Sequence, residues 1–289
     1  SDFYSTRLQQ VVNFYGSGKG GSRLVAKDRY NANSSGDVNV IGNYRTRPNN
    51  SSGTKVHIHV NQQIGSEKTR VEHCALRTGS WDSSTTLQVD VGGSGRIGGA
   101  GGDGGRGSDS SNGNSTSGRG GDGTSGLGVQ YNPTTVNVAS GGVITAGFGG
   151  GGGGGGAYDT DKEGARTASG GGGGGGAGIP AGAGGAAGFN AGVNGQPGNA
   201  GSISEGGTPG EGGNNDGEAV AGDGGTGGEA SDSADSGVTG QGGEGSTYSP
   251  GPAGSPGAAI RKTQSSFTVN VNIASSGSVN GSQNATTVL

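Results

Sequence analysis

The sequence predicts a mainly β base joined to a bundle of about ten short polyglycine II helices, with almost no α-helix. Three observations lead to this fold class. Residues 1–97 hold twelve glycines and residues 258–289 hold two, which leaves 61 of the 75 in residues 98–257. Glycine recurs at every third position in much of that middle region, and apolar residues alternate with polar ones on both sides of it.

The glycine content and the charge change at the same borders, and these borders predict the domains. Residues 1–97 form a β-rich base, residues 98–257 the glycine-rich sandwich, and residues 258–289 a β segment that returns to the base. Acidic residues outnumber basic ones 15 to 4 in the middle region, against 7 to 12 in the first and 0 to 2 in the last. An acidic insert argues against a nucleic-acid partner, since phosphate binding needs clustered Lys and Arg.

The first block contains two features whose roles stay open. In residues 1–15, Tyr4, Leu8 and Tyr15 recur at helical spacing, which predicts a helix that docks on a fibre or on its own β domain. His57 and His59 share one face of the strand "VHIHV", so they are weak candidates for a metal site on the axis of a trimer. Packed or surface histidines are the competing interpretation.

The period of three distinguishes the middle region from a flexible linker. "GGAGGDGGRG" (98–107), "GVNGQPGNAG" (192–201) and "GPAGSPG" (251–257) place glycine in a fixed register, which suits a left-handed helix with three residues per turn. Collagen requires an unbroken register and abundant proline, whereas the register here resets repeatedly and the chain has only 8 prolines. One chain folding back on itself as a bundle fits better.

The ten predicted helices follow the glycine pattern. They are 98–107, 118–126, 147–156, 170–178, 182–188, 192–201, 206–213, 222–228, 240–245 and 251–257. The uninterrupted runs 149–156 and 170–176 suit central helices surrounded on all sides, because a helix without Cβ atoms can hydrogen-bond sideways in several directions. If successive helices are antiparallel, loops 108–117, 157–169, 189–191, 214–221 and 246–250 share one end.

The opposite end collects the β-like sequence. "LQVDVGGSGRI" (87–97), "TVNVASGGVI" (135–144) and "FTVNVNIASSGSV" (267–279) resemble one another, and each alternates apolar and polar residues as a strand does. We expect these three repeats to meet in one small sheet on the base, with 127–146 forming a β-hairpin.

At this point the sequence resembles a family, the distal tail-fibre adhesins of T-even-type bacteriophages. The resemblance rests on "LQVDVGGSGRIGGAGGDGG", on "VNVASGGVITAGFGGGGGGGG" and on the glycine segments separated by variable loops, over about residues 86–260. It implies a polyglycine helix sandwich in the virion, at the distal tip of the tail or tail fibre. It also implies a fibre or tail-tip protein as one partner and a host outer-membrane protein, bound by the loops, as the other.

The loops that share one end supply the expected receptor-binding residues. Three of the five contain an aromatic residue, and exposed aromatics on Ser/Gly/Asn-rich loops are typical of a binding surface. The residues are Asp109, Asn112, Tyr158, Asp159, Asp161, Lys162, Glu163, Phe189, Asn190, Asn214, Asn215, Asp216 and Tyr248. Aromatic anchors would supply affinity, and the carboxylates would select basic partners.

We expect no enzyme, cofactor or membrane insertion. The three histidines and the one cysteine all precede residue 75, so no catalytic triad or paired-carboxylate site can be argued in the loops. "DTDKEG" (159–164) departs from a calcium loop because Gly170 stands at its twelfth position. No stretch approaches eighteen apolar residues, and the absence of Met favours cleavage from a longer precursor. The alternatives are an ice-binding or structural glycine-rich protein on the same bundle, and a disordered middle region.

Overall fold

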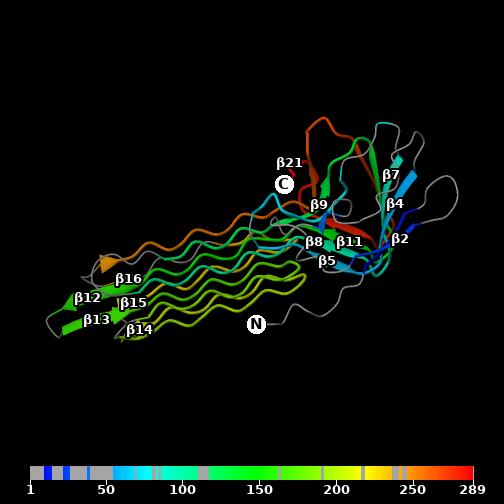
Figure 1. Ribbon diagram of the computed structural model, residues 1–289. Helices are drawn as coiled ribbons and strands as arrows, with labels where there is room; N and C mark the ends of the chain where they lie inside the picture. Colours follow the sequence, from blue (N-terminus) through cyan, green and yellow to red (C-terminus); the bar gives the residue numbers. More distant parts are fainter. Residues whose placement is uncertain are drawn as a thin grey trace. The chain divides into compact units, whose positions relative to one another are not determined.

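The structure is a computed structural model that divides the chain into two units (Figure 1). Unit 1 comprises Ser1–Gly99, Ser125–Ala146 and Ala258–Leu289, and unit 2 comprises Ala100–Thr124 and Gly147–Gly257. The described residues are 10–14, 22–26, 38–39, 55–68, 70–79, 83, 86–109, 117–161, 164–189, 192–215, 219–235, 241–242 and 246–288. Their regular elements are all strands, which confirms a mainly β fold. Among them we find no helix with the length and hydropathy needed to cross a membrane.

In its described part, unit 1 is a parallel β-helix of four coils, each made of three short strands. The three sheets have the strand orders β19-β10-β7-β4, β20-β11-β8-β5 and β21-β18-β9-β6-β3, all parallel. The first coil is β4 (Lys55–Val60), β5 (Gln63–Gly65) and β6 (Cys74–Arg77), and the second is β7 (Thr86–Val91), β8 (Arg96–Gly98) and β9 (Ser125–Val129). The third is β10 (Thr134–Val138), β11 (Val143–Thr145) and β18 (Ile260–Lys262). The fourth is β19 (Val269–Ile273), β20 (Ser278–Asn280) and β21 (Ala285–Thr286), while β3 (Val38–Asn39) precedes the first coil.

The alternation of apolar residues builds the interior of this β-helix. Because successive side chains of a strand point to opposite faces, one residue in two points inward, and the parallel register stacks equivalent residues. Ile58, Val89, Val136 and Val271 form one such row, of which the first three are fully buried. The three repeats therefore do meet, as expected, but in two parallel sheets rather than one, and residues 56–65 join them as a fourth repeat.

Two expectations for unit 1 are wrong. Residues 127–146 do not form a hairpin, because β9 and β10 belong to different sheets and pair with neighbouring coils. In a β-helix, consecutive strands lie in different sheets, so sequence neighbours seldom pair. The expected helix 1–15 is replaced over its described part by β1 (Gln10–Phe14), which pairs antiparallel with β2 (Ser22–Ala26). Adjacent β-branched residues at positions 11 and 12 favour the strand.

Unit 2 is inserted into the β-helix twice, at equivalent places in consecutive coils. The chain leaves between β8 and β9 in the second coil, and again between β11 and β18 in the third. Its glycine-rich segments are neither α-helix nor strand. Every third residue of a segment donates to the same neighbour: Gly102, Gly105 and Ser108 bond the carbonyls of Phe148, Gly151 and Gly154 at 2.8–2.9 Å.

The two uninterrupted glycine runs lie at the centre of unit 2. Residues 147–157 and 168–179 are buried throughout. The segment at 170–178 exchanges backbone hydrogen bonds with six others, namely 102–108, 148–154, 182–188, 196–202, 207–213 and 222–228. The segment at 147–156 likewise bonds 101–108, 118–124, 171–177, 222–228, 251–257 and Asp235. The expectation that these runs form the interior is confirmed.

One predicted segment of the bundle is displaced. Residues 240–245 include β16 (Gln241–Gly242), which pairs with β15 (Ala219–Val220) rather than with the glycine segments. The neighbour that bonds Gly152 is Asp235, whose carbonyl accepts its N–H at 2.9 Å and whose own N–H reaches Thr226 at 3.0 Å. Glycine periodicity missed residue 235 because a segment at the rim tolerates side chains.

Aspartates at the rim complete the hydrogen bonding of neighbouring segments. Carboxylates of Asp103, Asp122 and Asp223 accept the backbone N–H groups of Ala183, Ser255 and Gly212 at 2.7–2.8 Å. Arg119, one turn before Asp122 in a three-residue period, donates to the same carboxylate at 2.6 Å. Part of the acidic charge of the middle region therefore stabilises the scaffold itself.

A methyl group at the centre of the bundle should destabilise unit 2. A Cβ at Gly173 would lie 2.1 Å from the carbonyl oxygen of Gly151, so Gly173→Ala forces two backbone segments apart. We expect a loss of about 3 kcal/mol or more, the upper end of overpacking costs, measured by calorimetric unfolding. Ala186→Ser, at an exposed position of a neighbouring segment, is the control. Similar melting temperatures for the two variants would contradict the central position of Gly173.

Acid should weaken unit 2 through its rim carboxylates. The hydrogen bond from Arg119, and then that from the Ser255 N–H, hold the pKa of Asp122 below its usual 3.8. A lowered folded-state pKa means that the stabilisation is complete above about pH 4 and is lost as the pH falls through the folded-state value. Asp122→Asn keeps an acceptor without the charge, so its deficit in melting temperature should shrink between pH 5 and 2. A deficit that stays constant over this range would argue against a contribution of the Asp122 charge to the stability of unit 2.

Candidate functional site

Two small antiparallel sheets lie at one end of unit 2 (Figure 1). One contains β12 (Ala157–Asp161), β13 (Gly164–Ala168) and β17 (Ser246–Thr247), in the order β13-β12-β17. The other contains β14 (Asn214–Asn215), β15 and β16, in that order. The buried residues Ala157, Ala168, Ala219 and Ala221 form a small apolar cluster between them. Strands β12 and β14 directly follow glycine-rich segments of the bundle, and these segments fix the positions at which the two strands begin.

Backbone and side-chain bonds tie these sheets to the remaining loops. Gly213 N donates to Ser169 O at 2.9 Å, and Asn215 Nδ2 lies 3.4 Å from Thr167 O. Ser117 Oγ donates to the Ser249 carbonyl at 2.9 Å. The structure thus brings the described parts of loops 108–117, 157–169, 189–191, 214–221 and 246–250 to one end of unit 2.

Tyr158 and Tyr248 lie on the same face of the first sheet. Tyr158 is opposite Ser246 in the register, and Tyr248 extends the pairing, because its N–H donates to the Gly156 carbonyl at 3.1 Å. Residues two apart in a strand share a face, so the tyrosines are diagonal neighbours within reach of each other. Both are half-buried, each with part of its ring in contact with the protein.

Asp159 points the other way and is not part of the exposed surface. It is 3% exposed, on the same face of β12 as Ala157. Its Oδ1 has no hydrogen-bond partner among the described residues. The expected direct contact of this carboxylate with a receptor conflicts with this burial, and strand alternation is the reason, since consecutive residues of β12 face opposite sides.

Phe189 is the most exposed of the large apolar side chains in the described chain, at 73%. Its N–H donates to Asp109 Oδ1 at 2.7 Å. Arg106 Nη1 donates to Asp109 Oδ2 at 3.0 Å, and its Nη2 forms a short contact with Oδ1. The Arg106 hydrogen bond, ahead of the Phe189 N–H and the Arg106 charge, holds the pKa of Asp109 below its usual value despite some desolvation.

The remaining expected residues are only partly described. Asn214 is exposed and Asn215 is half-buried, both in β14. Asp161 ends β12, and only its backbone is described. The other candidates, namely Asn112, Lys162, Glu163, Asn190 and Asp216, lie outside the described residues.

The residues expected from the sequence to form the binding surface did not include Val193. It is 39% exposed and is fixed beside β13, because its N–H reaches the Thr167 carbonyl at 3.2 Å and its carbonyl accepts the Ser169 N–H at 3.0 Å. The available signal was a single large apolar residue within a Gly/Asn-rich segment. It was assigned to a scaffold segment because glycine recurs at every third position around it.

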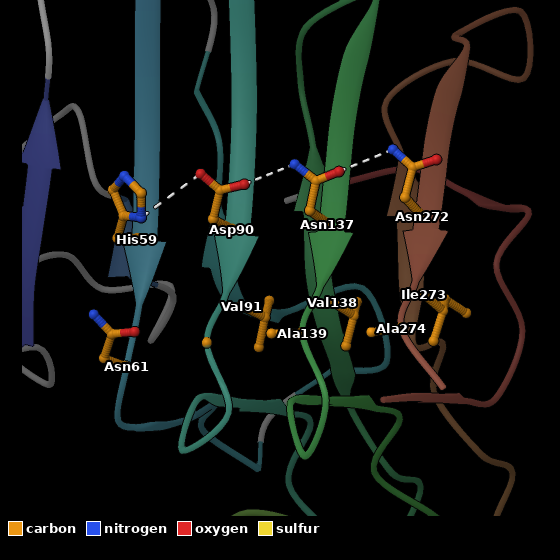
Figure 2. A pocket seen from close by; sticks show the side chains of 11 residues that line it. His59, Asn61, Asp90, Val91, Asn137, Val138, Ala139, Asn272, Ile273 and Ala274 are labelled. Atoms are coloured by element: carbon orange, nitrogen blue, oxygen red, sulfur yellow. Dashed lines mark hydrogen bonds and ion pairs between the residues drawn. The ribbon is translucent and has the colours of Figure 1, made fainter. Parts of the chain in front are cut away.

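The histidine motif of unit 1 belongs to a polar row on the outer face of the β-helix (Figure 2). His59, Asp90, Asn137 and Asn272 occupy equivalent positions in four coils. Asn272 Nδ2 donates to Asn137 Oδ1 at 2.8 Å, Asn137 Nδ2 to Asp90 Oδ1 at 2.7 Å, and His59 Nδ1 lies 3.6 Å from Asp90 Oδ2. The row borders a groove of about 420 Å³. No group of three or more metal-ligating side chains occurs among the residues described, and the side chain of His57 lies outside them.

Comparison with known proteins identifies the family. The family model described as phage tail fibre adhesin Gp38 matches residues 25–284, which is most of the chain. No curated protein and no solved structure gave a significant match. The match extends on both sides of the glycine-rich region, so it includes the strands of the β-helix except β21, as well as unit 2. The chain therefore belongs to the Gp38 family of phage tail fibre adhesins, receptor-binding proteins located in the tail fibre of the virion.

Proposed function

We propose that unit 2 is a sandwich of polyglycine II helices that holds a receptor-binding surface rigid. The three-residue period of its hydrogen bonds and the six neighbours of each central segment support this assignment. A Cβ at many of these glycines would lie about 2 Å from a backbone oxygen, so the segments approach one another as only glycine allows. Such close packing restricts relative movement of the loops at its end.

We further propose that this end of unit 2 binds an outer-membrane protein of the host. The observation that carries the proposal is Phe189, which is 73% exposed while its backbone is bonded to the scaffold. Tyr158 and Tyr248 on the sheet, together with Val193, add aromatic and apolar surface at the same end. Interfaces depend on a few such anchors, and anchors that are already ordered lose less entropy on binding.

Unit 1 offers a surface for the second partner, the virion. β19, β20 and β21 are edge strands of all three sheets, and in the described chain they pair on one side only. Ile273 of this coil is 46% exposed, whereas Val138, its equivalent in the coil below, is 2% exposed. Edge strands with exposed apolar residues readily accept another strand. We propose that a β-structured end of the tail-fibre protein stacks on this fourth coil.

Removing the Phe189 ring should reduce binding to host cells. We expect Phe189→Ala to lower adsorption of the purified chain to host cells by about 30-fold, as for a typical hot-spot residue. Ile203→Ala is the matched control, since Ile203 is 45% exposed in the connection 202–205 of the same unit. Adsorption would be measured by flow cytometry with labelled protein. Equal losses for the two variants would exclude a specific contribution of Phe189.

A charge on the fourth coil should block assembly and spare host binding. Ile273→Asp places a carboxylate where an added coil would bury a side chain, so we expect virions to carry less than about a tenth of the normal amount of adhesin. The purified variant should still adsorb to cells. Ile203→Asp is the control, and quantitative immunoblotting of virions is the measurement. Normal incorporation of the Ile273 variant would show that the fibre attaches elsewhere.

A further inference from the structure

The position of Phe189 depends on a side chain from a distant part of the sequence. The segment before it is fixed to the scaffold through Gly188, whose N–H donates to the Gly170 carbonyl at 2.9 Å. Beyond that point, the Phe189 N–H leaves the glycine network and donates to Asp109 Oδ1. The exposed ring gains little packing of its own, so this hydrogen bond is the described contact that orients the residue as it leaves the scaffold.

Asp109 is itself held firmly. It follows Ser108, whose N–H donates to Gly154 of a central run at 2.9 Å, and Gly107, whose N–H donates to Ala186 at 2.9 Å. Arg106, three residues earlier, bonds both carboxylate oxygens. The carboxylate therefore has a fixed position relative to the bundle, and the hydrogen bond to Phe189 transmits that position to the start of the loop.

These contacts argue against a direct role of Asp109 in gripping a receptor. Oδ1 accepts from both Phe189 and Arg106, and Oδ2 accepts from Arg106. A basic receptor side chain would have to share these oxygens with Arg106, which already bonds both of them. The carboxylate is only 29% exposed, whereas the neighbouring Phe189 is the exposed group.

We infer that Asp109 is a positioning residue, which orients the Phe189 anchor for the receptor through its backbone N–H. The inference rests on the proposed function, in which Phe189 contacts the receptor. Asp109 then contributes to specificity without being part of the contact surface. Arg106 supports it by fixing the carboxylate.

The chain contains a matched control for this arrangement. Asp122 accepts the Ser255 N–H at 2.7 Å and pairs with Arg119 three residues earlier, as Asp109 pairs with Arg106. The two aspartates thus make the same kind of bond to a neighbouring segment, and Asp122 orients no exposed aromatic residue. Asp109→Ala and Asp122→Ala should lower the melting temperature of unit 2 by similar amounts.

The experiment measures adsorption of the purified full chain to cells of the host bacterium. Asp109→Ala should reduce adsorption about five- to tenfold, and Asp109→Asn should restore most of it because the amide oxygen can still accept the Phe189 N–H. Asp122→Ala should adsorb normally. The double variant Asp109→Ala, Phe189→Ala should bind no more weakly than Phe189→Ala alone, because Asp109 acts only through Phe189.

Several outcomes would overturn the inference, and they separate it from the proposed function. If the losses in the double variant multiply, Asp109 acts on the receptor independently of Phe189. If Asp109→Asn is as defective as Asp109→Ala, accepting the Phe189 N–H is not what adsorption depends on. If Asp109→Ala and Asp122→Ala lose adsorption equally, the effect comes from scaffold stability. If Phe189→Ala adsorbs normally, the proposed function fails at this residue and the positioning role fails with it. If Phe189→Ala loses adsorption while Asp109→Ala adsorbs normally, only the positioning role is refuted and the proposed function stands.

Discussion

Lateral hydrogen bonding between backbones without side chains is the constraint on which unit 2 depends. The backbone hydrogen bonds of the glycine-rich segments run between segments, so every buried N–H and C=O needs a partner on another segment. The central runs meet this need with six neighbours each, and a Cβ at Gly173 or Gly151 would collide with a carbonyl oxygen about 2.0–2.1 Å away. Glycine loses the most conformational entropy on ordering, so a partial set of these hydrogen bonds would not offset the entropy cost of ordering the segments. The bundle is expected to form as one cooperative whole.

The same constraint explains the chemistry of the rim. Segments at the edge have fewer neighbours, so some of their N–H groups face outward and are bonded by side chains instead. Asp103, Asp109, Asp122 and Asp223 serve as these acceptors, and two of them are fixed by an arginine one turn earlier. A three-residue period places Arg and Asp three apart on the same side of the segment. Of these four, Asp109 was an expected receptor contact, and its carboxylate instead bonds the scaffold, while the expected contact Asp159 is buried.

The β-helix of unit 1 solves the same problem with a different pattern. The backbone N–H and C=O groups of its parallel strands pair with those of the next coil. Alternating side chains fill the interior, as in the row from Ile58 to Val136. The first three coils bury their apolar rows, whereas the fourth leaves Ile273 exposed and its strand edges unpaired in the described chain. A repeat architecture needs a cap or a partner at such an end. The partner surface proposed on each unit is in keeping with a tail-fibre adhesin, which implies a host receptor and a virion partner.

The sequence by itself determined the features that depend on local spacing. Glycine at every third position predicted the segments, the uninterrupted runs predicted the centre of the bundle, and the V-x-V repeats predicted strands that meet, whereas their parallel pairing in two sheets came from the structure. Antiparallel alternation was enough to group the loops that contain Tyr158, Phe189 and Tyr248. Only the tertiary structure decided which residues those loops expose. The strand β12 turns Tyr158 and Asp159 to opposite faces, residue 235 rather than 240–245 neighbours Gly152, and 127–146 divides between two sheets. Asp109 and Phe189 are 80 residues apart in the chain, and their hydrogen bond exists only because the bundle places their segments side by side. Periodicity specifies how a segment packs, but contacts between segments depend on which segments lie side by side in the bundle, which no local pattern contains.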